Sequence, residues 1–217
     1  MKKILMSILV TVSAIVAVWF FICARHTGKD DVTEMILSLP REFLVAPVEV
    51  SEHANVVKAR IRALPDKTRK MKAVTLLKST IIDMPVDKMP ADSRIAFLWQ
   101  YWVMSMNVAD VFRTDGNGEA EMFGFLLEIL SRYTKALDDC KKHENLRQMD
   151  KTGNDTAAER LMGAKMSDEI LHDIKNAEKL LLRHLGMKRY CLTLPEQERK
   201  QWQKRFFDAT GHSLPLD

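Results

Sequence analysis

The chain opens on a run of apolar residues that no charge interrupts. Residues 4–24 contain no Asp, Glu, Lys or Arg, so 21 uncharged positions follow one another. At about 1.5 Å per helical residue, this run can cross a hydrocarbon core of about 30 Å. Its far end is bulky, from Trp19 to Ile22, whereas a signal-peptide cleavage site needs small residues. The pattern predicts a retained single-pass transmembrane helix in residues 1–25.

Two alternatives to the anchor stay open. Residues 1–24 could be a signal peptide that is cleaved after Ala24, or Cys23 could be the acylated residue of a lipoprotein. Ile22 disfavours the second, because a small residue normally precedes an acylated cysteine. The N-terminal amine, Lys2 and Lys3 together carry slightly more positive charge than Arg25 and Lys29 on the opposite flank, so we expect the C-terminal domain outside the cytoplasm.

Beyond the anchor, the apolar positions recur at helical spacing. We expect a linker over residues 26–50, with a short helix from Asp31 to Leu39 that Pro40 stops and an extended stretch after it. The domain over residues 51–217 reads as a helical bundle. Its helices are predicted at 51–64, 66–83, 90–112, 119–143, 156–185 and 193–210. The fold class is therefore all-α. Ser51, Thr156 and Thr193 are predicted as helix caps, and Gly186 and Gly211 as helix ends.

The segment 90–112 is apolar nearly all round, which is typical of a helix buried in a core or a membrane. Gln100, Ser105 and Asp110 argue against a second membrane span. We therefore predict the central helix of the bundle, paired antiparallel with the next helix through a short loop. Gly124 in that next helix suggests a close approach of the neighbouring backbone.

Charge and cysteine content change this picture little. The chain has 33 bases and 29 acids, and three of the bases flank the apolar run, so the main domain is nearly neutral. A nucleic-acid partner is not expected. In the bundle, Cys140 and Cys191 are the cysteines that could form a disulfide.

One segment is strongly basic. From residue 58 to residue 78 there are eight bases and the single acid Asp66. This segment is a candidate binding surface for an anionic lipid surface or an acidic protein, and its aromatic-free composition disfavours nucleic acid. A solvated face that is balanced elsewhere in the fold is the alternative. The candidate residues are Lys58, Arg60, Arg62, Lys67, Arg69, Lys70 and Lys72, with Lys78 as the eighth base.

Catalytic chemistry has only weak candidates. Asp110 and Glu128 are lone acids in the two most apolar helices, and His184 falls near the apolar side of a third. They could form a buried acid–base or metal cluster. Alternatively, Asp110 pairs with Arg113 and Glu128 with Arg132 as ordinary helix-surface pairs. No nucleophile elbow, zinc motif or phosphate loop is present in the sequence, so we expect no cofactor.

A weak calcium pattern also occurs. The alternating oxygen ligands resemble the start of a calcium loop, but Ala120 and Leu126 stand where Gly and Glu are required, so no metal is expected. The candidate ligands are Asp115, Asn117, Glu119 and Glu121.

These patterns favour a membrane-anchored helical binding or scaffold module of a bacterial-type cell envelope, bound to the membrane through residues 4–24. A secreted or anchored hydrolase or metalloenzyme that uses Asp110, Glu128 and His184 is the alternative. A third possibility is self-association through aromatics such as Tyr101. The sequence leaves the oligomeric state open.

Overall fold

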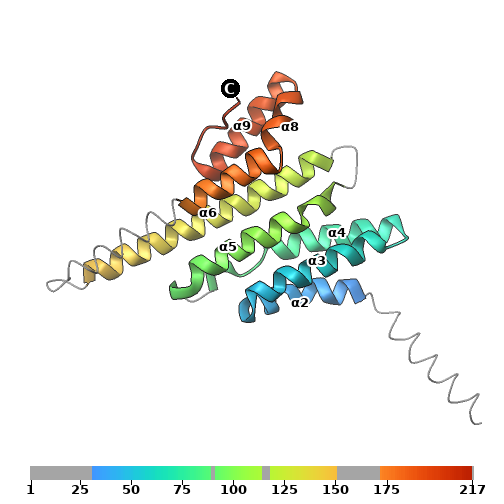
Figure 1. Cartoon of the computed structure of the whole chain (residues 1–217), viewed down its shortest axis with the longest axis horizontal. Coiled ribbons are helices and arrows are strands. Elements are labelled where there is room, and N and C mark those ends of the chain that lie inside the picture. The colour runs from blue at the N-terminus through green and yellow to red at the C-terminus, as the bar shows by residue number, and fades with distance from the viewer. Residues whose placement is uncertain (1–30, 89–90, 114–117, 151–171, 217) are drawn as a thin grey trace, which may run out of the picture.

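A computed structural model describes residues 31–88, 91–113, 118–150 and 172–216, and within these ranges it contains helices and no strand (Figure 1). The all-α class is thereby confirmed for the described part of the chain. Residues 172–179 are helical and continue into a π-helical turn. The elements are α2 Asp31–Val45, α3 Pro47–Ala63, α4 Lys67–Ile82, η1 Val86–Lys88, α5 Ala91–Val108, η2 Ala109–Phe112, α6 Gly118–Asp150, η3 Leu180–His184, α8 Met187–Thr193 and α9 Glu196–Thr210.

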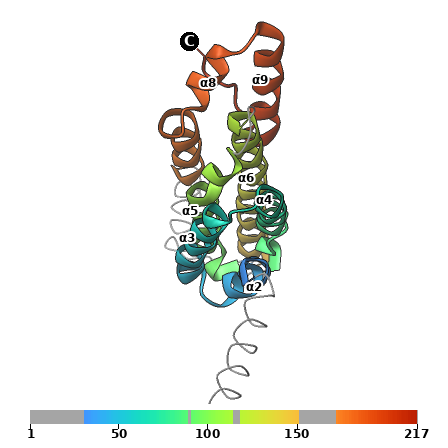
Figure 2. The ribbon, with the colours of Figure 1, turned by 90° about the vertical axis from the view of Figure 1, so that its right-hand side faces the viewer.

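The helices pack in layers. α2, α3 and α4 form one side, α5 and α6 run antiparallel through the middle, and α8 and α9 cover the other face of α6 (Figures 1 and 2). α5 contacts both α3 and α6, so the prediction of a central helix is confirmed. The buried apolar side chains of these helices form one continuous core.

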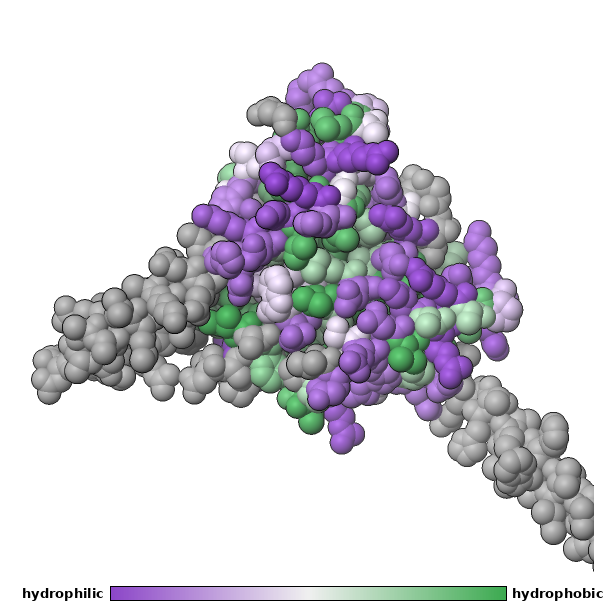
Figure 3. All heavy atoms as spheres, in the orientation of Figure 1, coloured by the Kyte–Doolittle hydropathy of each residue, from purple (hydrophilic) through white to green (hydrophobic). Residues whose placement is uncertain are grey.

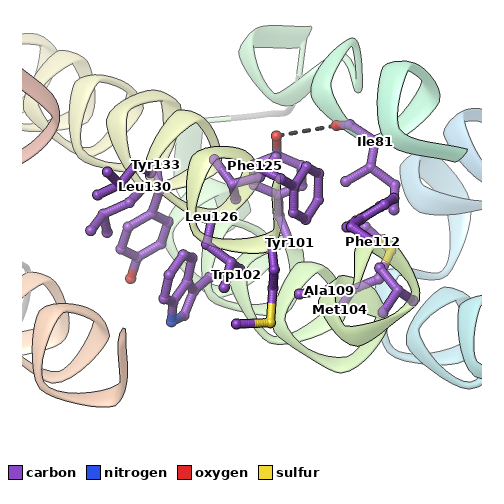
Figure 4. Packing of buried hydrophobic residues seen from close by; sticks show 14 of the residues in the cluster. Ile81, Tyr101, Trp102, Met104, Ala109, Phe112, Phe125, Leu126, Leu130 and Tyr133 are labelled. Carbon is purple, nitrogen blue, oxygen red and sulfur yellow. Dashed lines mark hydrogen bonds between the residues drawn. The ribbon is translucent and has the colours of Figure 1, made fainter. Parts of the chain in front are cut away.

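Large aromatic side chains from α5 and α6 fill the centre of this core (Figure 4). Trp102 lies with its ring centroid 6.3 Å from that of Tyr133. The Tyr101 hydroxyl donates a hydrogen bond of 3.1 Å to the carbonyl oxygen of Ile81, which ties α5 to the end of α4. Because Tyr101 is fully buried, the idea that it is an exposed aromatic for self-association is wrong.

The segment 31–50 differs from its prediction. α2 runs through Pro40 to Val45, and α3 starts at Pro47, so the extended stretch is wrong. Proline removes one helical hydrogen bond, but Phe43, which follows it in the helix, is buried. The burial of this apolar side chain offsets the lost hydrogen bond. Ser51 lies inside α3 and is no cap. The helices therefore cross the predicted boundary between linker and bundle.

Helix ends were predicted with mixed success. Gly186 and Gly211 both adopt left-handed conformations, with φ of 83° and 74°, and both terminate helices as expected. Thr193 is not the cap of α9: its hydroxyl donates to the Tyr190 carbonyl at 2.7 Å, and Pro195 precedes the helix instead. Gly124 faces the side chain of Arg205 in α9, not the backbone of α5.

In the described ranges, none of the helices combines the length and apolar character that a membrane span needs. The predicted anchor, residues 1–25, lies outside these ranges, as does Thr156, the predicted cap of the helix that ends near Gly186.

The contact between α2 and α3 includes a pH-sensitive pair. His53 hydrogen-bonds to the Glu42 carboxylate. Burial alone would raise the pKa of Glu42, but its hydrogen bonds with His53 and Ser38 outweigh burial and hold the pKa below its usual value of 4.5. A carboxyl group whose pKa is lower in the folded than in the unfolded chain stabilises the fold at pH values above its unfolded pKa. This stabilisation is lost as the pH falls through its folded pKa.

We therefore expect the free energy of unfolding to decrease as the pH drops below 4.5. The variant Glu42→Gln should lack this part of the pH dependence. The side chains of His53 and Glu42 are 26% and 37% exposed, so the effect should stay below about 1 kcal/mol. Urea unfolding of the full chain at a series of pH values measures it. Glu52→Gln, at an exposed position, is the control; an equal change in both variants would contradict the role of Glu42.

Candidate functional site

The basic segment forms the end of α3, a short turn and the beginning of α4. Pro65 prevents α3 from continuing, and Asp66 caps α4 by accepting a hydrogen bond of 2.6 Å from the backbone N–H of Arg69. The chain therefore reverses direction at residues 64–66. This reversal brings the end of α3 and the beginning of α4 together at one end of the molecule (Figures 1 and 2).

Three of these bases pair with acids from other elements. Arg62 and Lys58 both contact Asp110 in η2, the second at 3.5 Å. Lys78 in α4 pairs with Glu121 in α6 at 2.9 Å. These pairs join α3 and α4 to the central helices. For these three residues, acids from other elements therefore balance the positive charge, as the alternative interpretation of the segment predicted.

Four bases in the first turns of α4 remain. Among the described residues, no carboxylate lies within ion-pair distance of their side chains. Lys70 makes one weak hydrogen bond, 3.5 Å long, to the backbone oxygen of Arg62. We call this group the basic corner, and it consists of Lys67, Arg69, Lys70 and Lys72. Figure 3 shows mainly hydrophilic side chains over this end of the molecule.

Two clefts flank the basic corner. The larger, of about 510 Å³, lies toward η2 and is lined by Lys67, Lys70 and the added base Arg113, with Asp110 on its wall. The smaller, of about 220 Å³, lies toward α2. Its lining residues are Val32, Thr33, Leu64, Arg69, Lys72, Ala73 and Leu76. The corner thus presents cations into two hollows that an anionic group can enter.

Lys67, Arg69 and Lys70 lie in the first turn of α4, where positive charge is unfavourable for the helix, and the Asp66 carboxylate at the N-cap partly offsets this effect. The first turn of α4 contains bases and no acid. Because the N-terminus of a helix carries partial positive charge, each cation there costs up to about 1 kcal/mol. The same partial charge adds to the attraction of the corner for anions. Together with the helix terminus, these bases give this end of α4 a positive potential.

The corner was only partly predictable. Its lysines and arginine were candidates from composition alone. Arg113, Val32 and Thr33 were missed, because they join the clefts from η2 and α2 and no local pattern signals that contact. Arg60 is exposed and lines neither cleft.

The suggested acid–base cluster does not form as a buried site. Asp110 is bound by Arg62 and Lys58, so its predicted pairing with Arg113 is replaced by cations of α3. Glu128 and His184 are exposed. The predicted partner of Glu128, Arg132, instead donates to the carbonyl oxygen of Met84 at 3.3 Å. Glu128 and His184 therefore lack the burial that tunes catalytic groups, and the partly buried Asp110 is held by two cations of α3.

The calcium candidates are divided. Asp115 and Asn117 lie outside the described residues, while Glu119 and Glu121 lie in the first turn of α6. Glu121 is engaged with Lys78. Within the described ranges no cluster of His, Cys, Asp or Glu has the arrangement of a metal site.

The buried thiols are unreactive in character. Cys140 and Cys191 are free and buried, so the possible disulfide between them is not formed. Burial raises the pKa of Cys191 to about 11, against the opposing charge of Arg199. A cysteine nucleophile reacts as the thiolate, and a raised pKa suppresses that form.

Comparison with known proteins adds no relative: no family model matches the chain, and no curated protein or solved structure shows significant similarity to it. The geometry of the basic corner is therefore the basis for a functional argument.

Proposed function

We propose that this chain is a membrane-anchored binding module of a bacterial-type cell envelope, whose helical domain holds an anionic partner at the basic corner. Residues 4–24 are the anchor and residues 31–216 form the domain, placed outside the cytoplasm. The observation that carries the proposal is the group of four bases at the start of α4, which have no acidic partner among the described residues.

The uneven pairing of the segment supports binding over a purely structural role. Lys58, Arg62 and Lys78 form ion pairs that join the helices. The other bases form no such pairs within the described part of the chain, so joining the helices does not account for them. Of the four bases of the basic corner, Lys67, Arg69 and Lys70 stand in the first turn of α4, where the helix dipole disfavours cations. Each of the four lines one of the two clefts. Cations that no carboxylate holds in an ion pair attract anionic groups.

The test uses the full chain in nanodiscs of zwitterionic phosphatidylcholine and a fluorescent poly-glutamate peptide as the probe. We expect binding at low ionic strength that weakens as salt is added. Exposed ion pairs contribute about 0.2–1 kcal/mol each, so replacing Lys67, Lys70 and Lys72 by glutamine should weaken binding about tenfold. Fluorescence anisotropy measures the affinity.

The matched control removes the same number of charges at exposed positions of other helices, Lys135, Lys175 and Lys179. Equal loss of affinity in both triple variants would overturn the corner as the binding surface, and no binding of the peptide at all would exclude an acidic polypeptide as its partner. A chain that leaves native membranes in a carbonate wash would overturn the anchor.

A further inference from the structure

We propose that the basic corner rests on the phospholipid headgroups of the membrane that residues 4–24 enter, so that its partner is an anionic lipid surface. This inference deepens the proposed function and rests on it, because it names the partner of the same corner. Position, chemistry and tethering support it independently.

The position of the corner relative to the anchor is the first support. Val32 and Thr33, in the first turn of α2, line the smaller cleft together with Arg69 and Lys72. The beginning of α2 and the α3–α4 turn thus lie at the same end of the domain (Figure 1). Residues 25–30 separate the apolar run from α2, and a chain of this length spans at most about 21 Å. The corner is therefore held close to the point where the chain enters the bilayer.

The chemistry of the corner suits headgroups. Three of its four bases are lysines, which bind phosphates as point charges without a defined geometry. Met71 lies between two of these lysines in the sequence and is 43% exposed, so an apolar side chain is available to enter the boundary between headgroups and acyl chains. The segment 58–78 has no aromatic residue to stack on bases, which argues against nucleic acid.

Tethering makes a weak contact sufficient. Each base near an anionic membrane strengthens the contact by about fivefold. Exposed cations alone bind free vesicles only weakly, but the anchor makes the encounter intramolecular. An acidic protein would have to reach the same end of the domain against the bilayer, where the headgroups are already present at high local concentration.

The experiment compares lysine accessibility in two membranes. The full chain is placed in nanodiscs of phosphatidylcholine or of phosphatidylcholine mixed with phosphatidylglycerol, and exposed lysines are acetylated with a membrane-impermeant reagent. Mass spectrometry gives the labelling rate of Lys67, Lys70 and Lys72 relative to that of Lys200 and Lys204 in α9, whose side chains are 70% and 77% exposed. We expect the relative rate to fall about tenfold in the anionic discs and to recover at high salt.

A variant separates headgroup contact from a general effect of the anionic disc. Replacing Arg69 and Lys72 by glutamine leaves Lys67 and Lys70 as reporters, and their protection should be largely lost. The control variant, with glutamine at Lys135 and Lys175, should retain it. Equal protection in both variants would mean that the corner does not make the contact.

The outcomes distinguish the two proposals. If the relative labelling rate is the same in both discs while the corner still binds poly-glutamate, the lipid inference is overturned and an acidic protein becomes the partner. If the corner neither binds the peptide nor becomes protected, both proposals fail. Protection that requires both phosphatidylglycerol and the bases Arg69 and Lys72 supports the lipid surface.

Discussion

Replacing Phe125 by alanine is expected to lower the free energy of unfolding by about 3–5 kcal/mol, the usual range for a buried phenylalanine. The Phe125 side chain is fully buried in α6, and its ring centroid lies 4.5 Å from that of Phe112 in η2 (Figure 4). Its loss removes apolar contacts and leaves a cavity that the rigid helices around it close only partly. Urea unfolding of the full chain, followed by circular dichroism, measures the change.

The matched control is Phe207→Ala in α9, where the same side chain is 54% exposed. This change should alter the free energy of unfolding by no more than about 0.5 kcal/mol. Similar losses in both variants would contradict the assignment of the core. Because Phe112 holds η2, which also carries Asp110 on the wall of the larger cleft, Phe125→Ala should disturb that cleft as well.

Gly118→Ala is expected to destabilise the domain by about 1–3 kcal/mol through overpacking. Gly118 is the first residue of α6, and a Cβ atom there would lie 2.7 Å from the Arg113 Cα and 2.8 Å from the Arg113 carbonyl carbon. These are backbone atoms at the end of η2, so relief requires the two elements to separate. The melting temperature of the full chain provides the measurement.

Gly124→Ala, in the same helix, is the control for this prediction. Its Cβ would meet the Arg205 Nη2 at 2.9 Å, and that atom ends a flexible side chain that can shift. Alanine also favours the helix interior over glycine by about 1 kcal/mol. We expect a neutral or stabilising effect. A loss as large as that of Gly118→Ala would show that helix packing against α9 is tighter than the contact distances imply.

Local patterns predicted the helices where neighbours in sequence determine the outcome. The stripe of α6 from Phe123 to Leu137 is buried as its spacing indicated, and Asp66 caps α4 directly after the proline that ends α3. Pro40 misled the prediction. A proline disfavours a helix locally, but apolar burial on both sides of it decided in favour of α2, and that burial depends on helices distant in sequence.

Several site predictions depended on contacts that no local pattern contains. A pair of Asp110 with Arg113, three residues along its own helix, was the surface alternative, yet its cations come from α3, and Arg62 is 48 residues away in the sequence. Lys78 finds Glu121 at a separation of 43 residues. Glu128 and His184 were candidates for a buried cluster, with a surface pair to Arg132 as the alternative for Glu128, and both residues are exposed.

The sequence by itself determined that the described chain is helical, that its first two dozen residues include an uncharged run long enough to span a bilayer, and that the segment 58–78 is basic, because periodicity and composition are local properties. The tertiary structure decided which of those bases are neutralised and which remain. It also placed the basic corner beside the first turn of α2. This proximity arises from packing between helices, and no sequence pattern within α2 or α4 indicates it.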